Sequence, residues 1–152
     1  MNIFYLDHDP AKCAQAHVDR HVVKMIVESA QLLSTARRLA GDDVGYKLTH
    51  VNHPCAIWVR RSYGNYLWLF ELMVELANEY TFRYGKVHAT SRMFPELYIP
   101  HSGPFTEPAL AMPDEYKVGT ALESYQNYYR LGKAHLHKWT KRNPPEFMYA
   151  YN

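Results

Sequence analysis

The amino-acid sequence predicts an all-α fold: a single compact domain built on three main helices. The 152 residues are 47% apolar and 21% charged, which is the composition of a packed globular core, and no low-complexity tract interrupts them. Residues 11–39 contain neither Gly nor Pro, and Ala, Val, Leu and Met dominate them, which favours a long helix. Proline is instead concentrated between residues 88 and 113. We therefore expect one helical domain over residues 1–152, with a long Pro-rich loop that wraps the helical core.

The first long helix is expected from Pro10 to about Leu39. A short apolar segment, residues 2–6, precedes it, and the sequence Asp7-His8-Asp9-Pro10 that follows is a turn or helix-start signal. Gly41-Asp42-Asp43 then ends the helix.

The second long helix is expected from Pro54 to about Tyr84. Asn52-His53-Pro54 supplies a polar cap followed by proline at the first helical position. Gly85 is a C-terminal stop, and the neighbouring cations Arg83 and Lys86 are placed favourably against the helix dipole.

The last helix is expected from about Val118 to Lys138. It starts at Gly119-Thr120, and Glu123 stands three residues after Thr120, which is the spacing of a capping box. Between the second and the last helix, five prolines prevent one continuous helix. They are Pro95, Pro100, Pro104, Pro108 and Pro113.

Polar side chains line one face of the first predicted helix. At about 100° per residue, six of them fall within about 40° of one line. They are His17, His21, Lys24, Glu28, Gln31 and Thr35. One interpretation is an ordinary solvent face. The helix has a second polar line on its opposite side, however, at Lys12, Gln15, Asp19 and Arg37, and this line is the more ordinary water-facing surface. We therefore expect the first stripe to border a cleft.

The residue types of this stripe are those of proton-transfer chemistry. Lys24 and Glu28 are predicted to form the reaction centre, and His17 and His21 to act as general acids or proton carriers. The histidines stand at i and i+4 and could share a metal with Glu28, but a zinc site normally shows a third clear ligand, and Lys24 competes for the same carboxylate. We therefore predict no metal and no cofactor.

Basic, amide and aromatic residues near the predicted helix ends are candidates for phosphate binding. Asn52 and His53 lie at the start of the second helix, where free backbone N–H groups and the helix dipole favour an anion. The predicted substrate- or phosphate-binding residues are Lys47, Asn52, His53, Arg83, Lys86, His88, Tyr116 and Lys117. The residues predicted to contact a nucleic-acid backbone are Lys133, Lys138, Lys141 and Arg142. The alternative for Asn52 and His53 is a helix cap and a surface residue.

Four motifs occur in order along the chain. They are Asp19-Arg20-His21-Val22-Val23-Lys24-Met25, Asn52-His53-Pro54, Arg83-Tyr84-Gly85-Lys86-x-His88 and Ala111-Met112-Pro113-Asp114-x-Tyr116-Lys117. Together they resemble a family of small uncharacterised tailed-phage proteins. This resemblance covers most of the chain and implies no particular activity.

The order of the segments is also similar to that of the phage pyrimidine-dimer DNA glycosylase family. The shared layout is a short segment after the initiator Met, a long helix, Asn-His-Pro before a second long helix, Tyr-Ile-Pro-His at residues 98–101 and a basic, aromatic C-terminus. The resemblance implies an all-helical DNA enzyme in which an amine, the N-terminus or a lysine, attacks a sugar carbon with help from a glutamate. The family's Arg-Glu pair on the first helix is not matched, because His21 and Lys24 occupy the comparable region. We therefore expect another base chemistry than dimer excision, such as base-modifying transfer.

These observations predict a phage enzyme that acts on a DNA base or a nucleotide. Two alternatives stay open, a non-enzymatic phage protein that binds a host protein or nucleic acid, and a metal-dependent hydrolase. The formal net charge of +2 is not that of a strongly basic DNA-binding protein, and Cys13 and Cys55 are expected to be free buried thiols. Because no apolar run reaches the roughly 18 to 20 residues of a membrane span, we expect no membrane partner and a cytoplasmic protein, in the host cytoplasm if phage-encoded. The oligomeric state is not predicted.

Overall fold

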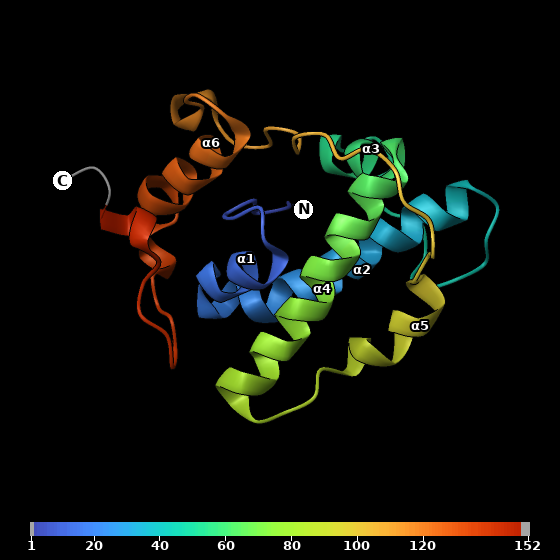
Figure 1. Cartoon of the computed structure of the whole chain (residues 1–152), viewed down its shortest axis with the longest axis horizontal. Coiled ribbons are helices and arrows are strands. Elements are labelled where there is room, and N and C mark those ends of the chain that lie inside the picture. Colours follow the sequence, from blue (N-terminus) through green and yellow to red (C-terminus); the bar gives the residue numbers. More distant parts are fainter. Residues whose placement is uncertain (1, 150–152) are drawn as a thin grey trace.

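The computed structural model describes residues 2–149, and the all-α class is confirmed (Figure 1). Within these residues the chain forms six α-helices and no strand. The helices are α1 (Pro10–Ala16), α2 (Asp19–Leu39), α3 (Pro54–Arg61), α4 (Tyr63–Tyr84), α5 (Phe94–Leu97) and α6 (Ala121–Asn127). Short 3-10 turns at Ala89–Met93, Asp114–Tyr116, Ala134–Leu136 and Glu146–Tyr149, and a π-helical turn at Tyr128–Gly132, complete the regular structure. No helix in this part of the chain is both long and apolar enough to cross a bilayer.

The first predicted helix is two helices, because the chain leaves the helical conformation at His17 and Val18. Both residues have extended dihedral angles, with ψ of 136° and 156°. Distant side chains satisfy the carbonyl groups that the interruption exposes. The Arg83 guanidinium donates to the carbonyls of Gln15 and His17, and the Trp139 indole donates to that of Ala16. The prediction of one uninterrupted helix is therefore corrected by a tertiary contact that the local sequence does not contain.

The second predicted helix is also divided, at Ser62. This residue is extended, with φ of −154° and ψ of 156°, and its hydroxyl accepts from the N–H of Asn65 as the N-cap of α4. Gly64 then lets the backbone of Gly103 approach, because a Cβ at position 64 would lie 2.3 Å from the Gly103 carbonyl oxygen. The predicted end at Gly85 is confirmed, since Gly85 has a φ of 68° and caps the helix.

The last predicted helix is shorter than expected. The capping box between Thr120 and Glu123 is present, but α6 ends at Asn127 and passes into the π-helical turn. The chain after that turn is irregular apart from the short 3-10 turns. The predicted helical boundary at Lys138 is therefore wrong by about three turns, and the buried Tyr129 lies in the wider π turn.

The core lies where α2 and α4 cross, and α1 and α3 pack beside them (Figure 1). The N-terminal segment is part of this core, because residues 3–6 are all buried. It lies between α6 and α4, since Gln126 donates to the carbonyl of Leu6 and Trp68 to that of His8. Residues 98–113 contain no helix and run along α3 and α4 toward α6 (Figure 1). Cys13 and Cys55 are buried free thiols, as predicted.

Candidate functional site

The first half of α2 carries three polar side chains of the predicted stripe, His21, Lys24 and Glu28, beside the N-terminal segment. The Phe4 ring lies parallel to the His21 ring, with 4.3 Å between the ring centroids and 11° between the planes. Phe4 is only 4% exposed, so the segment is fixed in place against α2. The N-terminal segment therefore covers the stripe at His21.

The buried Tyr129 contacts the His21 ring. The Tyr129 hydroxyl accepts from the backbone N–H of Val18 at 2.9 Å and lies 2.7 Å from Nδ1 of His21. Burial, with the nearby charges of His17 and Lys133, lowers the pKa of His21 to about 3. His21 is thus neutral at pH 7 and only 4% exposed, which corrects its predicted role as a proton carrier.

Lys24 and Glu28 form an ion pair one turn farther along α2. The Lys24 Nζ lies 3.8 Å from Oε2 of Glu28. The two side chains differ in exposure, since 63% of the Lys24 side chain and 15% of the Glu28 side chain are accessible to solvent. An amine that a ligand can reach therefore stands beside a mostly buried carboxylate.

Two aromatic rings and a lysine extend this surface toward the π-helical turn. The rings of Tyr116 and Tyr128 lie 5.1 Å apart, and Lys133 Nζ is 5.1 Å from the Tyr128 ring and 5.9 Å from the Phe4 ring. Lys133 thus joins the Phe4–His21 stack to the tyrosine pair. We call these five residues, Phe4, His21, Tyr116, Tyr128 and Lys133, the aromatic platform.

A glycine lets the tyrosines of the platform come together. A Cβ at Gly132 would lie 2.7 Å from Cδ1 of Tyr128 and 3.0 Å from Cζ of Tyr116, so a larger residue would displace one of the rings. The amide of Asn127 holds the Tyr116 backbone by donating to its carbonyl at 3.1 Å. The platform is therefore built by backbone geometry as well as by ring contacts.

The start of α3 lies within electrostatic reach of the stripe. His53 is the N-cap of α3, and its Nδ1 accepts from the N–H of Cys55 at 3.1 Å. Burial lowers the pKa of His53, and the charge of Glu28 opposes that shift. Asn2 of the N-terminal segment also contacts Cys55, at 4.0 Å from its sulfur. The structure therefore brings His53 within electrostatic range of Glu28, and the exposed Asn52 precedes it.

His17 does not belong to this surface, which corrects its predicted catalytic role. The side chain is fully buried, and its Nδ1–H donates to the Cys13 carbonyl at 2.6 Å. Burial lowers the pKa of His17 to about 4, so the ring is neutral at pH 7. Because the chain is extended at His17, this residue is not part of α2, and no ligand can reach it without local unfolding.

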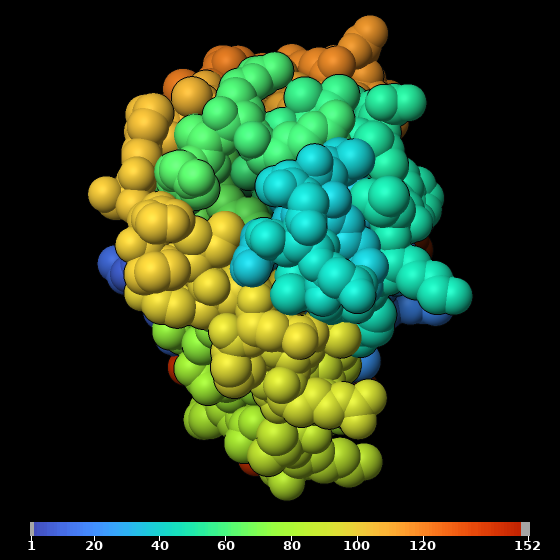
Figure 2. Space-filling model, turned by 90° about the vertical axis from the view of Figure 1, so that its right-hand side faces the viewer, coloured from blue at the N-terminus to red at the C-terminus, as the bar shows by residue number. Residues whose placement is uncertain are grey.

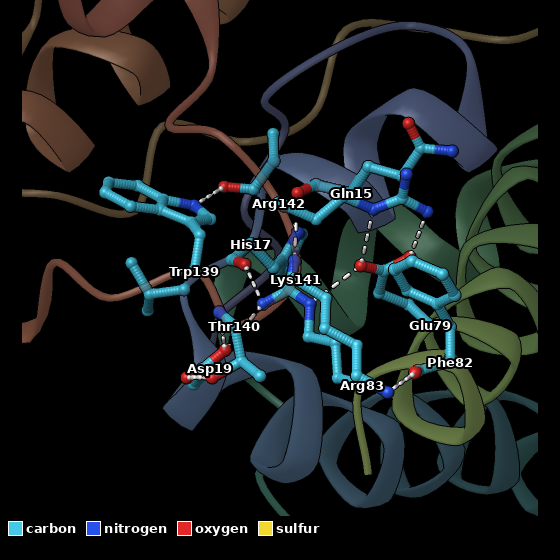
Figure 3. A network of polar contacts seen from close by, with 12 residues as sticks. Gln15, His17, Asp19, Glu79, Phe82, Arg83, Trp139, Thr140, Lys141 and Arg142 are labelled. Carbon is cyan, nitrogen blue, oxygen red and sulfur yellow. Dashed lines mark hydrogen bonds and ion pairs between the residues drawn. The ribbon is translucent and has the colours of Figure 1, made fainter. Parts of the chain in front are cut away.

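Arg83 is likewise buried, which corrects its predicted role in phosphate binding (Figure 3). Its Nε donates to Glu79 at 2.7 Å, and one terminal nitrogen bonds Asp19 at 3.0 Å as well as the His17 carbonyl. Arg142 donates to both oxygens of Glu79. Burial would raise the pKa of Glu79, but the hydrogen bonds from Arg142 and Arg83 bring it below its ordinary value. In this internal ionic network, every nitrogen of the Arg83 guanidinium is bonded to protein groups.

The other predicted binding residues do not gather at the platform. His88 caps the 3-10 turn at Ala89–Met93, and its ring packs on Tyr80. Lys117 pairs with Asp114 at 2.8 Å, and Lys141 donates to the Phe82 carbonyl. Lys47, Lys86 and Lys138 are exposed on separate segments. Of the four residues predicted to contact a nucleic-acid backbone, only Lys133 lies at the platform.

Sequence reasoning missed Phe4, Tyr128 and Tyr129 as parts of the site. Phe4 belongs to an apolar segment typical of core packing, and tyrosines at helical spacing are more often packing residues than stacking surfaces. The signal that could have found the two tyrosines is the density of rings with polar tips near the C-terminus, and no signal points to Phe4.

Within residues 2–149, no group of three or more His, Cys, Asp or Glu side chains is arranged to hold a metal ion. Comparisons with protein families, with curated proteins and with solved structures found no match.

Proposed function

We propose that the protein is an enzyme of phage type that acts on a DNA base or a nucleotide, with Lys24 and Glu28 at the reaction centre. The observation that supports this most strongly is that a reachable amine, paired with a mostly buried carboxylate, lies one helical turn along α2 from His21, the member of the aromatic platform on that helix. Core packing does not require an ion pair there, and stacked rings beside a cation are a surface that suits nucleobases.

The platform supplies the contacts that a base and its phosphate need. Tyr116 and Tyr128 are half-buried, so their rings keep accessible area on which a base can stack. Lys133 stands between them and Phe4, where its ammonium group can meet a phosphate oxygen. A base in duplex DNA would have to leave the helical stack to make these contacts.

The reaction we propose follows from the two polar side chains of α2. Glu28 takes a proton from the ammonium group of Lys24, and the free amine attacks the sugar carbon that carries the base. A carbon–nitrogen bond to Lys24 forms while the bond to the base breaks, and the departing base leaves with the electron pair of that bond and then takes up a proton. Opening of the sugar ring converts this covalent product into an imine, and a hydride donor reduces the imine to a stable amine.

The test is borohydride trapping on single- and double-stranded DNA that contains natural and modified pyrimidines. The wild-type protein is expected to form a covalent adduct whose mass maps to Lys24. Lys24→Ala should abolish the adduct, and Glu28→Gln should reduce it at least about a hundredfold, which is the usual scale of a lost general base. Lys12→Ala is the matched control, because Lys12 is also an exposed lysine but lies on α1.

Two results would overturn the proposal. One is full turnover by both α2 variants, with thermal unfolding unchanged. The other is an adduct that forms equally well with Lys24→Ala, since it would move the amine elsewhere in the chain.

A further inference from the structure

The protein has a cavity of about 730 Å³ that neither Lys24 nor Glu28 lines. The end of α2, the junction of α3 and α4, and residues 98–104 surround it. In Figure 2 these are the cyan, green and yellow segments around the hollow. The volume is within the range of about 300 to 1,000 Å³ that is usual for small-molecule sites.

The wall formed by residues 98–104 is held firmly against α4. The Ser62 hydroxyl donates to the Pro104 carbonyl at 2.6 Å. Gly64 and Gly103 are in backbone contact, because a Cβ at Gly64 would lie 2.3 Å from the Gly103 oxygen. The cavity is therefore a preformed feature of the fold, which lowers the ordering cost of binding a ligand.

The charge that lines the cavity favours an anion. Its charged residues are three arginines, Arg37, Arg60 and Arg61, and one aspartate, Asp42, which leave a formal charge of +2. Asp42 is paired with Arg37 at 2.7 Å. Arg60 donates to the Val51 carbonyl, and no ion pair within residues 2–149 involves Arg60 or Arg61. Two guanidinium groups are thus available for a phosphate, which arginine binds in a bidentate manner.

Aromatic rings line the same cavity and are more exposed than packing would require. Tyr63 and Tyr98 are 53% and 52% exposed, and the His101 ring lies 5.0 Å from that of Tyr63. Rings of this kind offer a stacking surface for a planar ligand. A bare inorganic anion would use the arginines only, and an apolar ligand the rings only, whereas a nucleotide uses both.

We infer that this cavity binds a nucleoside monophosphate unit, with its phosphate on Arg60 and Arg61 and its base against Tyr63, Tyr98 and His101. The unit is either a free nucleotide or the 5′-phosphorylated end of a DNA strand, which present the same chemistry. The inference does not depend on the proposed reaction at Lys24 and Glu28, because neither residue lines the cavity.

The test is calorimetric and NMR titration of the full-length protein with the four 2′-deoxynucleoside 5′-monophosphates, with the corresponding nucleosides and with inorganic phosphate. At least one monophosphate should bind about tenfold or more tightly than its nucleoside and than phosphate, because only the monophosphate uses both halves of the cavity. Arg61→Ala and Tyr98→Ala should each weaken this binding about tenfold, the scale of one lost charge-assisted hydrogen bond or one lost stacking contact.

Matched controls separate the cavity from the rest of the surface. Arg92→Ala and Tyr149→Ala remove an exposed arginine and an exposed tyrosine elsewhere, and they should leave binding unchanged. The double variant Lys24→Ala/Glu28→Gln should also bind normally, which keeps this test distinct from that of the proposed reaction. A 5′-phosphorylated oligothymidine that binds more tightly than free thymidine monophosphate would identify the strand end as the source, and the reverse order would identify the free nucleotide.

Three results would overturn the inference. The first is no binding of any monophosphate at millimolar concentration. The second is binding that neither Arg61→Ala nor Tyr98→Ala weakens. The third is binding of inorganic phosphate as tight as that of every nucleotide and insensitive to Tyr98→Ala.

Discussion

Replacing Arg83 with methionine removes the guanidinium from the internal ionic network and keeps most of the volume of the side chain. The Arg83 side chain is 0% exposed, and it contacts Glu79, Asp19 and the carbonyls of Gln15 and His17. Glu79 would keep Arg142, and Asp19 would keep its two hydrogen bonds to Thr140. The two carbonyls at the α1–α2 junction would lose their donor.

The expected cost is that of breaking a buried pair from one side, about 3 to 5 kcal/mol of the free energy of unfolding. For a chain of 152 residues, each kcal/mol lowers the melting temperature by about 2 to 4 °C, so Arg83→Met should melt about 6 to 20 °C below the wild type. Urea denaturation gives the free energy, and differential scanning calorimetry gives the melting temperature.

Arg92→Met is the matched control, because Arg92 is exposed and takes part in no ion pair within residues 2–149. It should stay within about 0.5 kcal/mol of the wild type. A loss below about 1 kcal/mol for Arg83→Met, together with weaker DNA binding, would refute the structural role of Arg83 and restore its predicted role as a phosphate ligand.

Three further predictions test the site and its buried histidines. On folding, the pKa values of His17 and His21 fall from 6.5 to about 4 and about 3, so the unfolded chain takes up protons first as the pH is lowered. The free energy of unfolding present above pH 6.5 should therefore decrease as the pH falls from there toward 4, by up to about 1.4 kcal/mol per pH unit for each histidine. A free energy of unfolding that stays constant over this range, measured in urea, would contradict the burial of both rings. Gly132→Ala introduces a Cβ that would meet Tyr128 at 2.7 Å, and it should lower the turnover rate while the melting temperature changes little. Unchanged kinetics would remove the tyrosine pair from the mechanism. Lys133→Ala should lower the slope of log binding constant against log salt concentration by about one unit. Fluorescence anisotropy with DNA between about 50 and 200 mM salt measures this slope, and a slope equal to that of the wild type would exclude a phosphate contact at Lys133.

Local signals in the sequence predict the helical class and several helix boundaries. Pro10 and Pro54 are the first residues of helices, Gly85 ends one, and Thr120 with Glu123 forms the expected capping box. Each of these signals acts within one turn of the backbone, so the order of residues is enough to recognise it. The break at His17 follows from partners far along the chain, whereas Ser62 is a local N-cap that the sequence prediction did not use.

In the candidate site, too, the contact between neighbours in sequence is predicted and the contacts between distant residues are not. Lys24 and Glu28 are one helical turn apart, so the sequence places them together, and the structure confirms their contact at 3.8 Å. Phe4 and Tyr128 reach the same surface from opposite ends of the chain, and they are brought together only by the packing of the N-terminal segment against α6 and the π-helical turn. The cavity beside residues 98–104 was not foreseen either, because loop residues meet the α3–α4 junction there through backbone contacts.

The contact between the C-terminal segment and the α1–α2 junction bears on how the protein folds during synthesis. Trp139 and Thr140 bind Ala16 and Asp19, residues that leave the ribosome more than a hundred positions earlier. Until those partners emerge, nothing satisfies the carbonyl of Ala16 in an extended junction, and an uninterrupted helix over residues 10–39 is the better local solution for the nascent chain. We therefore expect the first helix to break late, when the last residues of the chain reach it.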